Sequence, residues 1–217
     1  MDRTVHPWAR RADAAVDYAR HGWKLLPGAI WDGRHYTRGH HTRVVSDLEP
    51  VLPVERATSD LYRVSRWWRT APWSVLAVTG EKFDVITAPT TVAMAATHTM
   101  PWRHNPCPVA VSPSVVRFFV APGAALRPDL ATVPGVEVLP AGSLVPLPPT
   151  PVRCGVVTWW VSPSSLGWRL GSSLAVQARA RRGHAVADDV AEPRVTCSPC
   201  GSPCGSPSSW VPRSPSY

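Results

Sequence analysis

The chain has 217 residues, of which 44% are hydrophobic and 18% are charged, and this length is enough for one large domain with a buried core. Lys and Arg number 23 against 15 Asp and Glu, and the resulting net charge of +8 favours an anionic partner. No window approaches the ~20 apolar residues of a membrane span, and the N-terminus lacks the apolar core of a signal peptide. We therefore expect a cytoplasmic protein with no membrane role and with reduced cysteines.

The first elements in the chain are a predicted helix and a predicted strand. Residues 9–21 (ARRADAAVDYARH) carry small apolar residues at helical spacing, which predicts an amphipathic helix. Gly22 is typical of the position just beyond a helix C-terminus. Residues 23–26 (WKLL) predict a short strand that Pro27 and Gly28 end.

Residues 27–57 are polar and are interrupted by Gly and Pro, which predicts a long irregular segment. Three histidines lie in it, at positions 35, 40 and 41, among several arginines. Metal binding by these histidines is one interpretation. A closed zinc site needs four well-spaced ligands, so a solvated basic loop is the better interpretation.

The stretch from Thr58 to Pro89 begins with a second predicted amphipathic helix, which ends before a tight Trp/Pro turn. Thr58 or Ser59 can cap it by accepting a free backbone N–H group of the first turn, and Asp60 lies where the helix dipole favours an anion. The predicted inward face carries Leu61, Val64, Trp67 and Trp68, whereas Arg63, Arg66 and Arg69 lie off that face.

Several short strands are predicted after this helix. Residues 74–78 (SVLAV) are β-branched and end before Thr79-Gly80, which predicts a buried strand, and a second short strand follows. Residues 90–100 predict a short helix. Residues 108–112 and 115–121 predict a hairpin turned by Pro113-Ser114.

The remaining elements are shorter and richer in proline. Residues 136–139 and 143–147 predict another strand pair, and residues 156–161 a last strand. The run PLPPTP at 146–151 is extended and unsuited to a central strand. A turn at 162–170 leads to a predicted final helix at 173–181.

The composition changes at about residue 182, where large apolar residues become few. Such a segment buries too little surface to offset its ordering entropy, which predicts a disordered C-terminal tail. Cys197, Cys200 and Cys204 have metal-like spacing, but they lie in a tandem SPCG pattern and only His184 is near as a fourth ligand. We expect a domain at 1–172, followed at 173–217 by a short helix and this tail.

The order of these features resembles the N-terminal domain of bifunctional DNA primase/polymerases, the prim-pol branch of the archaeo-eukaryotic primase fold. AAVDYARHGWKLLPG is similar to the family phrase "ALxYAxxGWxVxPL", and ATSDLYRVSRWWRTAPWSVLAVTG is similar to "ATTDPxxVxxWWxxxPxxNVGxxTG". The later PAGSLVPLPPT resembles the family's glycine-then-"YVVAPPS" segment. The resemblance covers residues 12–170 and implies an α/β (α+β) fold, a primase-like mixed sheet flanked by helices.

The resemblance also implies where catalysis would occur. Nucleotidyl transfer in this family rests on metal ions held by carboxylates, so Mg or Mn is expected if any activity remains. The family's "hhhDhD" pair falls on Thr87 and Pro89, and the histidine that contacts nucleotide phosphates falls on Arg117. Asp84 lies three residues before Thr87, and on a strand it points to the opposite face. The resemblance thus implies degenerate catalytic positions.

Three functions remain open from the sequence. The first is a catalytically degenerate domain that binds single-stranded DNA or a nucleotide through basic residues, namely Arg117, Lys82, Arg153, Arg63, Arg66 and Arg69. We interpret Trp67, Trp68 and Trp73 as core residues rather than as base-stacking residues.

The second function is an active primase/polymerase with a displaced metal site at Asp84, together with Asp129 or Glu137. The third is a protein-interaction module that reuses the fold, to which the proline-rich segment at 146–151 and the tail are suited. The chain has no GxxxxGK[ST] motif, so a replication helicase would be a separately encoded partner.

Overall fold

The structure is a computed structural model that describes residues 7–38, 43–93 and 106–178. The mixed helix and strand class expected from the sequence is confirmed, and the strands are divided among several sheets. The predicted tail and its cysteines lie outside the described residues, as do positions 94–100 and 179–181 of two predicted helices. Within the described ranges, no helix is long and apolar enough to cross a membrane.

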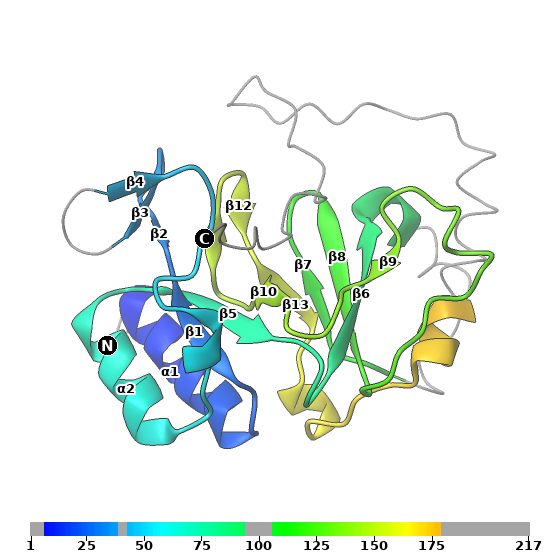
Figure 1. The fold of residues 1–217 in the computed structure, drawn as a ribbon, viewed down its shortest axis with the longest axis horizontal. Helices are drawn as coiled ribbons and strands as arrows, with labels where there is room; N and C mark the ends of the chain where they lie inside the picture. Colours follow the sequence, from blue (N-terminus) through cyan, green and yellow to red (C-terminus); the bar gives the residue numbers. More distant parts are fainter. Residues whose placement is uncertain (1–6, 39–42, 94–105, 179–217) are drawn as a thin grey trace, which may run out of the picture.

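Two helices cover one face of a three-stranded sheet (Figure 1). This antiparallel sheet has the order β1-β5-β10. Its core side chains pack against those of both helices, and the other face packs on a small cluster that includes Leu26 and Tyr36. The five elements are α1 (Pro7–Arg20), α2 (Leu61–Thr70), β1 (Leu25–Gly28), β5 (Ser74–Val78) and β10 (Leu144–Pro146).

The predicted C-terminus of the first helix is confirmed. Gly22 has a φ of +78°, a left-handed conformation that favours glycine. Its N–H donates to the carbonyl of Ala19, and the N–H of Trp23 donates to the carbonyl of Tyr18. These two bonds form a Schellman motif, which satisfies the last carbonyls of the helix.

The N-cap of α2 differs from the prediction of Thr58 or Ser59. Asp60 has an extended backbone, and its side chain accepts a hydrogen bond from the N–H of Arg63 at 2.8 Å. The Thr58 hydroxyl accepts instead from the N–H of Asp60 at 3.0 Å. Because Asp60 is the residue that leaves the helical conformation, its carboxylate is the group that reaches the first turn.

The prediction that residues 27–57 are irregular is wrong in part. Three very short strands form an antiparallel sheet there, in the order β2-β3-β4, and a 3-10 turn follows. Strands of two or three residues are too short to show an alternating pattern, which is why the sequence did not reveal them. They are β2 (Ile30–Trp31), β3 (Tyr36–Arg38) and β4 (Arg43–Val45), and the turn is η1 (Val54–Arg56).

A five-stranded antiparallel sheet, ordered β13-β7-β8-β6-β9, forms the other half of the molecule (Figure 1). The predicted hairpin is confirmed as β7 and β8. The chain turns at η3 (Ser164–Leu166) after the last strand. The sheet contains β6 (Asp84–Pro89), β7 (Val109–Val111), β8 (Val115–Val120), β9 (Glu137–Val138) and β13 (Thr158–Val161).

One pairing prediction is wrong, and one predicted strand is divided into two. The strands predicted at 136–139 and 143–147 do not pair with each other, because β9 pairs with β6 whereas β10 pairs with β5 in the other sheet. The strand predicted at 156–161 is interrupted at Val157. Its first part, β12 (Gly155–Val156), pairs with β11 (Pro151–Val152), and only the second part joins β7.

Both faces of the five-stranded sheet are buried, by different residues. Val85 and Phe119 lie on the face that packs with Trp23 and the helices. Ile86 lies on the other face, in a cluster that includes Val176. Residues 173–178 are helical, and Gln177 is fully buried with its amide bonded to the backbone of Arg127 and Ala125.

Candidate functional site

The five-stranded sheet brings three candidate residues into one row. Thr87 of β6 lies directly opposite Arg117 of β8 and, on its other side, directly opposite Glu137 of β9. Residues directly opposite each other in a ladder point to the same face. Glu137, Thr87 and Arg117 therefore lie side by side on the face that turns toward the helical half of the molecule.

Thr87 occupies the centre of this row. It is 3% exposed, and its hydroxyl oxygen is buried without a hydrogen-bond partner. Such a group is uncommon, because a buried hydroxyl without a partner costs about 1–3 kcal/mol. Pro89, the other position of the expected acidic pair, lies on the same face and offers no side-chain ligand.

Arg117 is half-buried beside Thr87. One of its guanidinium nitrogens donates a hydrogen bond to the Ser112 hydroxyl at 3.2 Å. Burial lowers the pKa of Arg117 to about 10, so the side chain remains charged at neutral pH. In the described part of the chain, none of the ion pairs includes Arg117.

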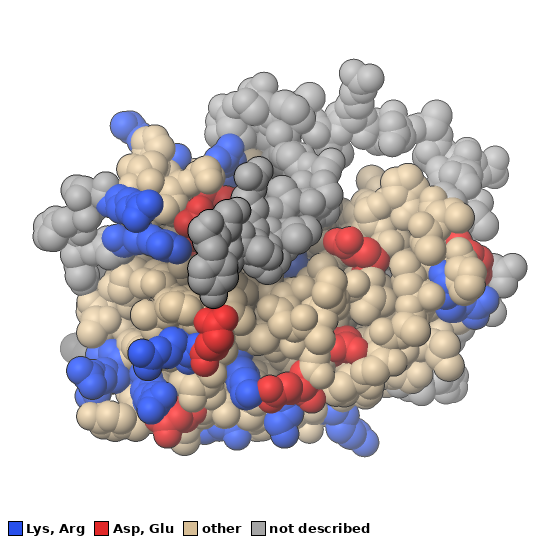
Figure 2. Space-filling view, viewed as in Figure 1, with Lys and Arg blue, Asp and Glu red and all other residues tan. Residues whose placement is uncertain are grey.

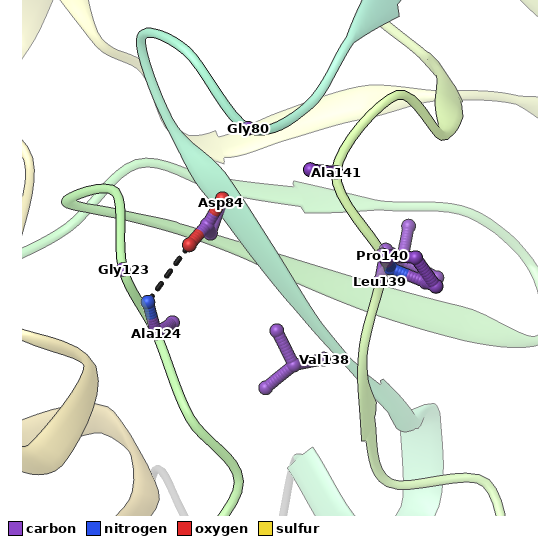
Figure 3. A pocket seen from close by; sticks show the side chains of 8 residues that line it. All are labelled: Gly80, Asp84, Gly123, Ala124, Val138, Leu139, Pro140 and Ala141. Atoms are coloured by element: carbon purple, nitrogen blue, oxygen red, sulfur yellow. Dashed lines mark hydrogen bonds between the residues drawn. The ribbon is translucent and has the colours of Figure 1, made fainter.

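Asp84 begins β6 and points away from this row, as its offset of three residues predicts. It lines a hollow of about 470 Å³ (Figure 3). One carboxylate oxygen of Asp84 accepts a hydrogen bond from the N–H of Ala124 at 2.8 Å. This bond connects the turn that follows β8 to the start of β6. The other residues that line the hollow are Gly80, Gly123, Ala124 and Val138 to Ala141.

The other two acidic candidates do not lie with Asp84. Asp129 pairs with Arg127, with 3.0 Å between the Arg127 Nε atom and the carboxylate. Glu137 lies on the opposite face of the sheet from Asp84. Among the residues that the structure describes, no three His, Cys, Asp or Glu side chains form a group that could hold a metal ion.

Three of the basic candidates lie together on α2. Arg63, Arg66 and Arg69 are exposed on this helix, and Figure 2 shows Lys and Arg side chains gathered over the helical half of the molecule. The tryptophans of this region pack inward, as expected. Trp68 is fully buried, and Trp67 and Trp73 pack against the same core cluster.

Lys82 and Arg153 lie apart from these arginines. Lys82 is exposed in the turn before β6, with its side chain beside Gly22. Arg153, in the β11–β12 turn, donates from its guanidinium to the Ser46 carbonyl at 3.3 Å. The six basic candidates are thus spread over several elements, and Arg117 is the one that lies in the row.

The sequence alone did not reveal the position of Glu137 beside Thr87. The two residues are far apart in the chain, and only the pairing of the two-residue strand β9 brings them together. Ser112, which accepts from Arg117, was also missed. Ser112 is the last residue of the predicted strand at 108–112, and a lone serine next to a turn carries no functional signal.

A family model described as bifunctional DNA primase/polymerase, N-terminal, matches residues 15–197. The chain belongs to this prim-pol family. The matched residues include the whole row and both halves of the fold. Comparison with curated proteins and with solved structures gives no match.

The prim-pol family implies divalent metal ions, and the donor set of the row is unsuited to them. Mg²⁺ and Mn²⁺ take oxygen ligands, chiefly carboxylates. The row offers one carboxylate, from Glu137, together with the neutral Thr87 and the cationic Arg117. A guanidinium beside the site repels a dication instead of holding it.

Proposed function

We propose that this chain is a prim-pol domain with degenerate catalytic positions that retains nucleic-acid or nucleotide binding in a replication-related role. The observation that supports this proposal is the set of side chains in the row that contains Glu137, Thr87 and Arg117. At the two positions onto which the resemblance places the family's metal-binding carboxylates, β6 has Thr87 and Pro89, and the adjacent strand presents Arg117. This arrangement suits an anion better than a metal ion.

In this proposal Arg117 contacts a phosphate of single-stranded DNA or of a nucleotide. The exposed arginines Arg63, Arg66 and Arg69, with Lys82 and Arg153, contribute attraction for further phosphates along a strand. We propose that the protein acts in the cytoplasm beside a separately encoded replication helicase. We propose a domain at residues 1–172, followed at 173–217 by a short helix and a low-complexity tail.

A comparison of binding and catalysis tests this proposal. We expect a labelled single-stranded oligonucleotide to bind the wild type and to bind Arg117→Gln about tenfold more weakly, because one charge-assisted contact of about 1.4 kcal/mol is lost. Arg20→Gln, an equal change of charge at an exposed position on α1, is the matched control. In a primer-extension assay with Mg²⁺ or Mn²⁺, no product is expected.

Two results would contradict the proposal. Primer extension that Asp84→Asn abolishes would identify an active polymerase with a displaced metal site. An absence of binding to DNA and nucleotides, with association to a protein that does not depend on salt, would identify an interaction module instead.

A further inference from the structure

The row on the five-stranded sheet carries one cation, Arg117, and one carboxylate, Glu137, whereas a metal-binding centre carries clustered carboxylates. Thr87 separates Glu137 from Arg117, and the strands that carry these two charged residues are about 10 Å apart, at about 4.8 Å per strand spacing. In the described part of the chain, no ion pair joins the one cation of the row to its one carboxylate. A half-buried cation without a counterion is costly, so the position favours an anion.

We propose that this row binds a phosphate group without a divalent metal ion. The positive charge of the Arg117 guanidinium would neutralise the phosphate, as a divalent metal ion does in metal-dependent prim-pol domains. The inference rests on the proposed function, because it concerns the same phosphate contact. A guanidinium offers several N–H donors in a plane and suits phosphate oxygens well. The Ser112 hydroxyl accepts a hydrogen bond from the Arg117 guanidinium and so holds it in place. Thr87 carries no charge, so it does not form an ion pair with Arg117 that would compete with a phosphate ligand.

Binding of dATP in excess EDTA and in excess MgCl₂ tests the inference. We expect the affinity in EDTA to equal or exceed the affinity in MgCl₂, because Mg²⁺ bound to the triphosphate reduces its charge and its attraction to Arg117. Arg117→Gln should weaken binding about tenfold in EDTA, whereas Arg20→Gln should not.

Two variants at Thr87 separate charge from shape. Thr87→Asp and Thr87→Asn have side chains of the same size, and only the first adds a carboxylate directly opposite Arg117. The carboxylate would pair with the guanidinium and compete with phosphate. In EDTA we therefore expect Thr87→Asp to bind dATP at least about tenfold more weakly than Thr87→Asn, with thermal unfolding confirming that both variants fold.

The outcomes distinguish this inference from the proposed function. Binding of dATP that requires Mg²⁺ would overturn the inference and leave the proposed function standing. Equal affinities of Thr87→Asp and Thr87→Asn in EDTA would also overturn it, because the row would then not be the phosphate site. If neither dATP nor single-stranded DNA binds in either buffer, the proposed function itself is wrong.

Discussion

At the scale of single residues, Thr87 lowers the stability of the protein and also lies in the candidate phosphate site. Its hydroxyl is buried on β6, an inner strand of the five-stranded sheet, and has no hydrogen-bond partner. A sequence under pressure only to be stable would place an apolar residue there, because an unsatisfied hydroxyl costs free energy. A site that is kept for a ligand can tolerate this cost.

Replacement of Thr87 by Val tests whether the hydroxyl is unsatisfied in solution. Val has nearly the same shape, so the change removes the polar group and leaves the packing intact. We expect the free energy of unfolding, measured with urea, to stay the same or rise by about 1 kcal/mol. A fall of more than about 1 kcal/mol would show that the hydroxyl has a partner in the native state.

Asp60 carries a second prediction at this scale. Because its carboxylate accepts the N–H of Arg63, Asp60→Ala should lower the free energy of unfolding by about 0.5–2 kcal/mol. Ser59→Ala, one residue earlier, is the matched control and should change it by less than about 0.5 kcal/mol. Urea denaturation of both variants checks the cap, and the reverse order of effects would place it at Ser59.

At the scale of elements, the turn between β5 and β6 positions both halves of the fold. Gly80 has a φ of +103°, and an added Cβ atom there would lie 2.6 Å from the Cβ atom of Ala141. The Thr79 hydroxyl donates to the Pro140 carbonyl at 2.7 Å. The Thr-Gly pair therefore holds the 140–143 turn against the end of β5, at the entrance to the turn that leads into β6.

Gly80→Ala tests this close approach. Gly33 has nearly the same φ, +102°, but an added Cβ atom there would have no atom within 4 Å. The loss of stability in Gly33→Ala therefore measures the cost of the left-handed backbone conformation without a steric clash. We expect both variants to lose stability and Gly80→Ala to lose at least about 1 kcal/mol more, because backbone must shift to admit the methyl group. Equal losses in urea denaturation would show that the turn does not pack on Ala141.

Elements with local signals were predictable from the sequence. The helix before Gly22, the strand at 74–78 and the hairpin around Pro113 follow from capping, β-branched residues and turn chemistry. The pairing of β9 with β6 was not predictable, because a strand of two residues has no periodicity and its partner is distant in the chain.

For the candidate site, the positions of individual residues were predictable from the sequence, but their arrangement in space was not. Thr87 and Arg117 lie on predicted strands, and the resemblance identified both positions. That they lie directly opposite each other depends on the register between β6 and β8, which the sequence does not specify. The burial of the Thr87 hydroxyl depends on packing from other elements and is visible only in three dimensions.

At the scale of the whole molecule, Lys and Arg are unevenly distributed over the face that Figure 2 shows. Lys and Arg gather over the helices and the small sheet and are sparser over the five-stranded sheet (Figure 2). With a net charge of +8, the protein attracts a polyanion at long range, and Arg117 then supplies a contact within the sheet. This division predicts that nucleic-acid binding depends strongly on salt.

The most direct measurement is a titration with single-stranded DNA at several salt concentrations, followed by tryptophan fluorescence. Each phosphate contact contributes about −0.7 to the slope of log affinity against log salt concentration, so a steep negative slope is expected for the wild type. The slope for Arg117→Gln should be shallower by about 0.7. An absence of binding at low salt, or a slope that Arg117→Gln leaves unchanged, would contradict the assignment of Arg117 as the phosphate contact.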